Sequence, residues 1–281
     1  NIVLAWLLGA SFLSQTCHAQ VFSITSFRDL YYTQTSDSAV AAAGAGFNMG
    51  LSESHVGDFS AVSATYPGPG SPLTLPPPSF PGSQAFNYYS PTYATKAAMD
   101  AAFPGGTYVF NATGAAGPAT ATVDYPADAY SPSLPMLAGT TFSDLQSLDP
   151  GQIFTLQFSS FVLDPKASIG YLDFVTYDLA TQAPVFYRTD LPSSTTTLDI
   201  PAGAFLPNHA YSFALIYDDS LYFPSSGALY DTHVGFDNRT SGQFTTVPEP
   251  SSATLLLVAI GLVGRARHWR HRRKLPCGLQ Q

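Results

Sequence analysis

Residues 205–218 read FLPNHAYSFALIYD, and the second half of this stretch decides the fold class. Large apolar side chains occupy every second position, at Tyr211, Phe213, Leu215 and Tyr217. Successive side chains of a β-strand point to opposite faces, so this period of two predicts a half-buried strand.

The sequence around this strand has the same character over residues 131–246. Residues 154–158 alternate between apolar and polar side chains, and 172–177 and 185–188 flank a short turn as a hairpin would. A further strand is expected around Leu198 and Ile200. Strands every 10–15 residues with turns between them predict an antiparallel β-sandwich.

Three side chains just before the 211–217 strand have a particular spacing. Phe205 is followed two positions later by Pro207 and six positions later by Tyr211. This spacing resembles the tyrosine corner of fibronectin type III domains. The resemblance implies a fibronectin/immunoglobulin-like sandwich over residues 131–246, with Tyr211 hydrogen-bonded back to the corner backbone.

A second β-rich region is expected over residues 20–130. Strands are predicted at 21–24 and 107–110, and a small-residue stretch occupies 39–46. The Pro- and Gly-rich residues 67–82 predict a long loop. The sequence TYATKAAMDAA at 92–102 predicts one helix, with a Thr N-cap and a Pro-Gly-Gly stop. The fold class is therefore mainly β, with one short soluble helix.

The body between Gln20 and Val247 is strongly acidic, although the whole chain has a net charge of −8. It contains five cations and 18 acids, a net charge of −13. Such a body repels phosphate backbones, so nucleic acid is excluded as a partner. Both cysteines, Cys17 and Cys277, lie outside it. A disulfide within the body, a cysteine metal site or a thiol nucleophile is therefore excluded.

The first 19 residues predict a signal peptide. Residues 2–13 (IVLAWLLGASFL) are continuously apolar, and small residues at Cys17 and Ala19 suit cleavage by signal peptidase before Gln20. The chain starts at Asn1 without Met or a basic segment, which suggests that its start is truncated.

Residues 247–281 contain three parts in order. A Pro-Glu-Pro motif is followed by an apolar run and then by a basic cluster. The motif is Val247, Pro248, Glu249 and Pro250; the apolar residues include Ala253, Leu255, Leu256, Leu257, Val258, Ile260, Leu262 and Val263; the cluster is Arg265, Arg267, Arg270, Arg272, Arg273 and Lys274. Prolines keep the motif extended, and the cations hold the end of a short transmembrane helix in the cytoplasm.

This order of parts resembles the PEP-CTERM sorting signal of Gram-negative bacteria. The resemblance implies passage through the inner membrane, processing by an exosortase and association with exopolysaccharide. A plain C-terminal anchor without processing is the alternative. Residues 275–281 continue past the point where such signals usually end, which leaves the topology unchanged.

No catalytic residues are predicted in the body. His55 lies close to Glu53, Ser54 and Asp58, but no Gly-x-Ser-x-Gly elbow accompanies any serine. The sequence also lacks His-Glu-x-x-His and a Gly-rich phosphate loop. We therefore expect a non-enzymatic protein without a cofactor, and a secreted hydrolase is the least favoured hypothesis.

Four acids are weak candidates for a calcium site: Asp218, Asp219, Asp231 and Asp237. Oxygen-rich loop ends of an extracellular sandwich can converge on Ca²⁺, but solvated acids that keep the protein soluble explain them better. No metal site is therefore predicted.

Tyrosines are abundant, at Tyr31 and Tyr32, at Tyr88, Tyr89 and Tyr93, and at Tyr222. Aromatic rings can form a sugar-binding face, although core packing explains most of them. The sequence thus predicts an exported, non-enzymatic cell-surface or matrix protein. A carbohydrate-binding or Ca²⁺-dependent adhesion module is the alternative.

Overall fold

A computed structural model describes residues 22–79, 82–115, 117–223 and 230–248. Within them the chain is mainly β, which confirms the predicted fold class. The described elements are β1 (Phe22–Gln34), β2 (Val40–Glu53), β3 (Phe59–Thr65), β4 (Leu73–Leu75), β5 (Ala85–Tyr89), α1 (Lys96–Ala102), β6 (Gly106–Gly114), β7 (Gly117–Tyr125), α2 (Thr141–Leu145), β8 (Phe154–Gln157), β9 (Ile169–Asp178), β10 (Pro184–Pro192), β11 (Thr197–Ile200), β12 (Ala210–Phe223) and β13 (Tyr230–Thr245).

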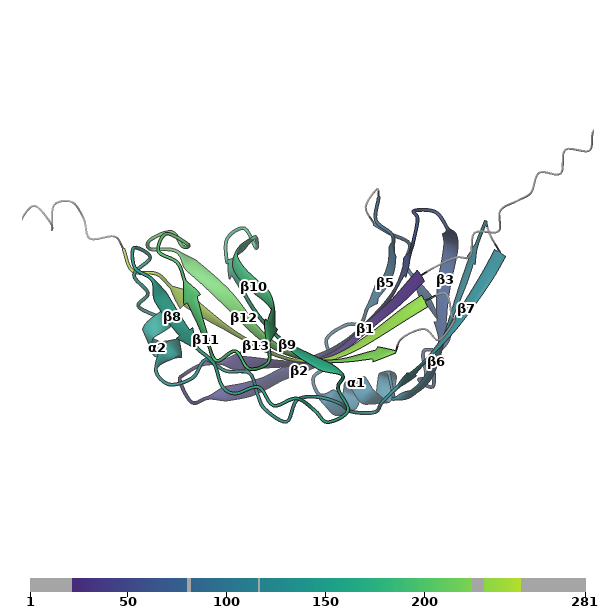
Figure 1. Ribbon diagram of the computed structural model, residues 1–281, viewed down its shortest axis with the longest axis horizontal. Coiled ribbons are helices and arrows are strands. Elements are labelled where there is room, and N and C mark those ends of the chain that lie inside the picture. The colour runs from purple at the N-terminus through teal and green to yellow at the C-terminus, as the bar shows by residue number, and fades with distance from the viewer. Residues whose placement is uncertain (1–21, 80–81, 116, 224–229, 249–281) are drawn as a thin grey trace, which may run out of the picture.

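One large sheet runs through the whole body. Its seven strands have the order β10-β9-β12-β13-β1-β2-β5. Neighbouring strands are antiparallel except β1 and β13, which pair in parallel. Figure 1 shows that this sheet is bent, with β10 on one raised arm and β5 on the other. The body is therefore organised around a sheet that joins its first and last strands.

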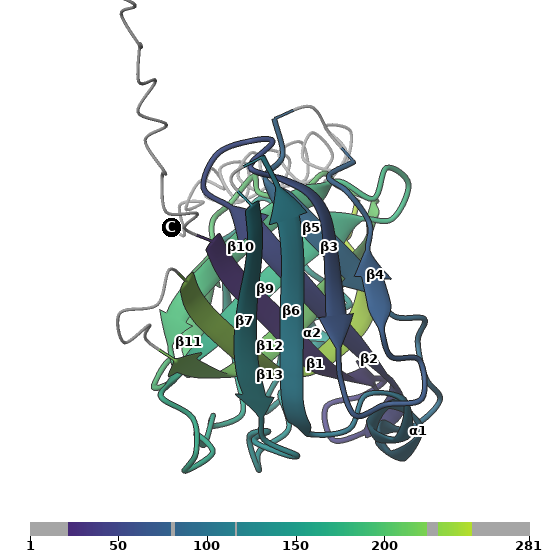
Figure 2. The same cartoon turned by 90° about the vertical axis from the view of Figure 1, so that its right-hand side faces the viewer.

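Two hydrophobic cores lie against opposite halves of the sheet. The first core is closed by the four-stranded sheet β4-β3-β6-β7, which faces the viewer in Figure 2, and by α1. The second core is closed by the two-stranded sheet β11-β8 and by α2. The boundary expected at residues 130 and 131 falls in the segment between β7 and α2, whereas the large sheet continues from one half to the other.

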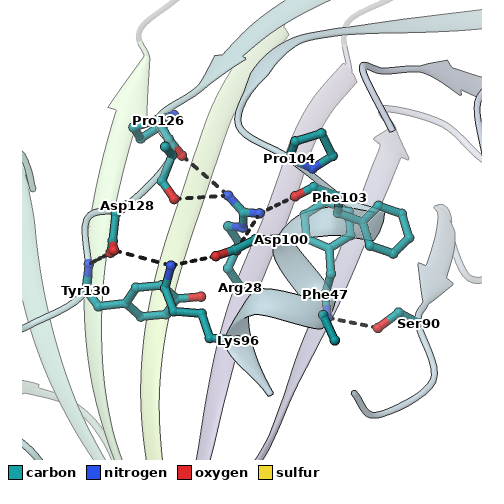
Figure 3. A network of polar contacts seen from close by, with 12 residues as sticks. Arg28, Phe47, Ser90, Lys96, Asp100, Phe103, Pro104, Pro126, Asp128 and Tyr130 are labelled. Atoms are coloured by element: carbon teal, nitrogen blue, oxygen red, sulfur yellow. Dashed lines mark hydrogen bonds and ion pairs between the residues drawn. The ribbon is translucent and has the colours of Figure 1, made fainter. Parts of the chain in front are cut away.

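A buried arginine fixes helix α1 beneath the sheet. Arg28 of β1 is 1% exposed, and its guanidinium donates to the carbonyl oxygens of Phe103, Pro126 and Ala127. It also donates to Asp100 of α1 at 3.2 Å. Figure 3 shows these acceptors gathered around the guanidinium. The planar guanidinium has five N–H donors, so it can bond to several oxygens at once.

Lys96 extends the same network at the other end of α1. Its ammonium lies 2.7 Å from Asp100 and 3.3 Å from Asp128, and it stands over the ring of Tyr130 at 5.4 Å. Both ion pairs are drawn in Figure 3. The network therefore ties α1 to the segment that leads from β7 toward the second core.

Several elements differ from the sequence prediction. The helix expected at 92–102 begins at Lys96, because Thr95 caps it by accepting a hydrogen bond from the amide of Ala98. The strand expected at 21–24 extends through β1 to Gln34, and residues 40–46 of the small-residue stretch lie in β2. A short strand, β4, also lies within the predicted Pro/Gly loop.

The face of the large sheet opposite both cores is the candidate for function. Phe22 and Ile24 of β1 are buried in the first core. Alternate residues Ser23, Thr25, Phe27, Asp29 and Tyr31 lie on the other side and are half-buried. We name this side the concave face, because the sheet bends toward it (Figure 1).

Candidate functional site

The tyrosine corner predicted from the sequence is present. The backbone amide of Leu206 donates to the phenolic oxygen of Tyr211 at 2.8 Å, as the resemblance implied. Tyr211 is 1% exposed, and its ring packs on Phe205 and Phe244. Since Tyr211 stands near the start of β12 and Phe244 near the end of β13, the corner holds these two strand ends together.

The sorting motif begins where the packed body ends. The hydroxyl of Thr246 accepts from the amide of His209 at 3.0 Å and donates to the carbonyl of Leu206 at 2.6 Å. The amide of Val247 donates to the carbonyl of Leu148 at 2.9 Å. Pro248, the next residue, is exposed. The first residue of the motif, Val247, is therefore still bonded to the body, and the Pro-Glu-Pro part starts at the next residue.

Most of the predicted sorting signal lies outside the described residues. This applies to Glu249 and Pro250, to the apolar run 253–264, to the basic cluster 265–274, and to the predicted signal peptide with its cleavage site. Neither helix of the described residues has the length and apolarity to cross a membrane.

A row of carboxylates crosses the floor of the concave face. Strand register places Asp29 of β1 beside Asp237 of β13, and Asp237 beside Asp218 of β12. Asp29 also accepts hydrogen bonds from Tyr31 at 3.2 Å and from Asn48 at 3.4 Å. Three acids on adjacent strands thus form one continuous row.

Burial raises the pKa of every acid in this row. It raises the pKa of Asp218 to about 6. The pKa of Asp237 is raised well above its ordinary value, first by burial and then by the charges of Asp218 and Asp29. Burial also raises the pKa of Asp29, against opposing hydrogen bonds and the charge of Arg239. Like charges so close together cannot all ionise, so at neutral pH the row both donates and accepts hydrogen bonds.

Aromatic rings flank the row on one side. Tyr222 and His233 lie opposite each other on β12 and β13, with ring centroids 4.7 Å apart and planes within 4°. Phe27 meets His233 edge-on at 5.1 Å. Burial lowers the pKa of His233, which keeps its ring neutral at pH 7. These rings form a continuous aromatic cluster beside the carboxylates.

A serine connects the two groups. The hydroxyl of Ser220 donates to Asp218 at 2.8 Å and lies 2.7 Å from Nε2 of His233. Because the hydroxyl proton goes to Asp218, the neutral His233 must donate from Nε2. In a hydrolase triad the histidine lies between the serine and the acid, whereas here the fully buried Ser220 lies between them.

Glycines allow two of the rings to lie flat on the sheet. A side-chain carbon at Gly46 would collide with the ring of Tyr31, and one at Gly235 would collide with the ring of Phe27. Both glycines are on the concave face, opposite Asp29 and Phe27 in the register. The shape of this face therefore depends on two positions without a side chain.

The four calcium candidates do not converge. Asp218 and Asp237 share the concave face, but Asp219 points to the opposite side and accepts from the amide of Asp164 at 3.0 Å. Asp231 is exposed at the start of β13. Within the described parts of the chain, no three His, Cys, Asp or Glu side chains are placed to hold a metal ion.

The residues considered for hydrolysis lie elsewhere. His55 is an exposed side chain 3.5 Å from Asp58. The carboxylate of Glu53 accepts from the amides of Gly57 and Phe59, and so shapes the turn after β2. A further histidine of the body, His209, is bonded to Asp178 at 2.7 Å beside the tyrosine corner.

The predicted tyrosines divide between the two sides of the sheet. Tyr88 and Tyr93 pack against the first core, and Tyr32 lies on the same side of β1 as the core residues. Tyr31, Tyr89 and Tyr222 lie on the concave face.

Sequence reasoning missed Asp29, Phe27 and the role of His233. The alternation of residues 23–31 is a signal that could have placed Phe27 and Asp29 on one face. Their approach to β13 could not be foreseen, because it requires a parallel pairing between the first and last strands of the body.

Comparison with known proteins identifies a sorting motif at the C-terminal end of the chain. The described fold defines a mainly β protein built from several sheets. A family model, the PEP-CTERM protein-sorting motif, matches residues 246–273. The chain therefore carries this sorting motif, which indicates an exported protein, anchored through its C-terminal signal and processed by an exosortase.

Solved structures with some similarity are chains of immunoglobulin-related architecture. They include the FN1–FN3 domains of chicken CNTN1, at 9% identity over 78% of this chain and 65% of that chain, with a TM-score of 0.26. A marsupial T cell receptor is 13% identical over 83% of this chain and 74% of that chain, with a TM-score of 0.27. No curated protein matches the sequence. The chain thus spans 65% of the length of the CNTN1 fragment.

Proposed function

We propose that this chain is an exported, non-catalytic surface or matrix protein of a Gram-negative bacterium that associates with exopolysaccharide. The observation that carries the proposal is the PEP-CTERM motif at residues 246–273, which begins where β13 leaves the body. An apolar segment at 2–13 supports export, since a signal peptide and a cytoplasmic basic tail require the same topology.

In this proposal the body is the exported domain, and the C-terminal segment is its sorting signal. Signal peptidase cleaves before Gln20, the apolar segment 253–264 holds the precursor in the inner membrane, and the exosortase acts near Pro250. The acidic body then remains in the polysaccharide layer. The calcium-dependent module and the secreted hydrolase stay predictions, because the described residues considered for them do not come together in one site.

The processing part is tested by replacing Pro248, Glu249 and Pro250 with Ala in the producing cells. We expect an uncut precursor in the membrane fraction, while the control with Ser251 and Ser252 changed to Ala is processed normally. Intact mass gives the readout, because the processed wild type should start at Gln20 and end near Pro250, whereas the uncut precursor keeps its basic tail. Unchanged processing of the motif variant would contradict the proposal.

The association part is tested on the same cells. Exopolysaccharide is recovered by centrifugation and washing, and the wild-type protein should be recovered with it. Digestion or removal of the polysaccharide should release the protein into the soluble fraction. A protein that separates completely from the polysaccharide at the first wash would contradict this part alone.

A further inference from the structure

The concave face presents its side chains in regular cross-strand rows. One row runs through Asn87, Gly50, Thr25, His233 and Tyr222, from β5 to β12. The next runs through Tyr89, Asn48, Phe27, Gly235 and Ser220, and the third is the carboxylate row that ends beside Tyr171 of β9. Aromatic rings, amides and carboxylates therefore alternate over neighbouring strands of one surface.

Three tyrosines of this face are well exposed. Tyr89 on β5 is 71% exposed, Tyr187 on β10 is 59% exposed and Tyr222 on β12 is 48% exposed. Tyr187 pairs with Val175, whose side of β9 is the concave one. The strands that carry them, β5, β10 and β12, lie on both arms of the bent sheet (Figure 1). Exposed flat rings on separate strands suit an extended ligand with several flat, weakly apolar faces.

The ring of Tyr222 is oriented for such a contact. His233 stacks on one of its faces, so the exposed area belongs to the remaining face and the edge. The hydrogen bonds from Ser220 to Asp218 and between Ser220 and His233 hold this stack in one orientation. A preorganised ring loses little side-chain freedom when a ligand covers it.

The polar groups of the face select for hydroxyl groups. Asp29, Asp237 and Asp218 lie side by side, and their raised pKa values favour a protonated carboxyl beside ionised ones. Such a row can both donate and accept hydrogen bonds, as sugar hydroxyls do. Asn48 and Asn87 add amide donors and acceptors, and Arg239 adds a donor beside Tyr31. Such mixed hydrogen-bonding capacity suits a neutral polyhydroxyl chain better than a cation.

Charge excludes other occupants. Among the residues that the structure describes, this face carries Asp29, Asp173, Asp218 and Asp237 against one cation, Arg239, and the whole body is acidic. A second copy of this chain would bring the same acids against these, and an acidic polymer would meet like charge.

We infer that the concave face binds a neutral polysaccharide chain, with sugar rings lying against Tyr222 and Tyr89 and sugar hydroxyls bonded to the row of Asp29, Asp237 and Asp218. This inference rests on the proposed function, because it supplies the site through which the body would hold exopolysaccharide.

The test is affinity electrophoresis of the full chain, solubilised in mild detergent, through gels containing exopolysaccharide from the producing cells. Anion exchange first separates this material into a neutral and an acidic fraction. We expect the neutral fraction to retard the wild type. Tyr222→Ala and Tyr89→Ala should each weaken binding at least tenfold. Tyr222→Phe, which keeps the ring, should bind as the wild type does.

Phe223→Ala is the matched control. Phe223 is the next residue of β12 and is 37% exposed, but its side chain points to the opposite side of the sheet. It should bind like the wild type, and unchanged melting temperatures identify variants that remain folded. Tyr89 and Tyr222 are on different strands. If one of the two variants fails to fold, the other still tests the site.

The outcomes separate this inference from the proposed function. If the wild type and both tyrosine variants are retarded equally, or if Phe223→Ala fails as Tyr222→Ala does, the site is wrong although association stands. If the acidic fraction alone retards the protein, the neutral ligand is wrong. If neither fraction retards the wild type, both the site and the association with exopolysaccharide are wrong.

Discussion

The backbone amide of Leu206 donates a hydrogen bond of 2.8 Å to the phenolic oxygen of Tyr211. The carbonyl of Leu206 accepts another from the hydroxyl of Thr246 at 2.6 Å. One corner residue thus connects the beginning of β12 to the segment that follows β13. This arrangement fixes the point at which the chain leaves the body for its sorting motif.

Replacing Tyr211 by Phe should destabilise the body by about 1–2 kcal/mol, because the amide of Leu206 loses its acceptor. Urea unfolding followed by circular dichroism measures the effect. Tyr89→Phe is the control, since Tyr89 is 71% exposed. Coincident curves for Tyr211→Phe and the wild type would show that the corner bond contributes no stability.

Gly235→Ala should destabilise the protein by about 1–3 kcal/mol, because the new methyl group overlaps the ring of Phe27. The added change Phe27→Val makes room for it. A double-mutant cycle should therefore show that the two changes together cost less than the sum of their separate effects. Additive costs would mean that the ring and the glycine do not interact.

Arg28→Ala should cost about 3–5 kcal/mol, since it removes a buried charge from Asp100 and leaves three carbonyl groups without their donor. Arg28→Lys should recover little, because one ammonium cannot reach all these acceptors. Arg188→Ala, at an exposed arginine of β10, is the control. Thermal unfolding measures these effects. Equal melting temperatures for Arg28→Lys and the wild type would show that the guanidinium hydrogen bonds are not needed for stability.

Local patterns predicted those features that depend on local sequence. The alternation at 211–217 located β12, and the spacing of Phe205, Pro207 and Tyr211 located a corner hydrogen bond that the structure contains. The Pro-Glu-Pro motif located the sorting signal. Each of these three patterns involves residues that are close together in the sequence.

Features that depend on distant pairing could not be predicted. Residues 40–46 contain one branched side chain, Val40, among alanines and glycines, yet they belong to β2 because they pair with β1. Gly46 there makes room for the ring of Tyr31. Likewise, the carboxylate row forms only because β1 pairs in parallel with β13. Neither Asp29 nor Asp237 carries a local signal of that contact.

A buried acid beneath the bend predicts how stability depends on pH. Asp219 is fully buried, and burial raises its pKa to about 7. The charges of Asp164 and Asp218 also raise this pKa, whereas the backbone amide of Asp164, which donates to the carboxylate at 3.0 Å, opposes the shift. In the unfolded chain its pKa returns to about 3.8.

Between these two pKa values the folded protein holds a proton on Asp219 that the unfolded chain has lost. The free energy of unfolding must therefore fall as the pH rises from about 4 to about 7, by at most about 1.4 kcal/mol per pH unit. We expect a higher melting temperature at pH 5 than at pH 8. Asp219→Asn should flatten this dependence, whereas Asp231→Asn, at an exposed acid, should leave it unchanged. Because the comparison is between variants, it isolates Asp219 from Asp218 and His233, which also titrate. An Asp219→Asn protein with the same slope as the wild type would show that this carboxyl group ionises normally.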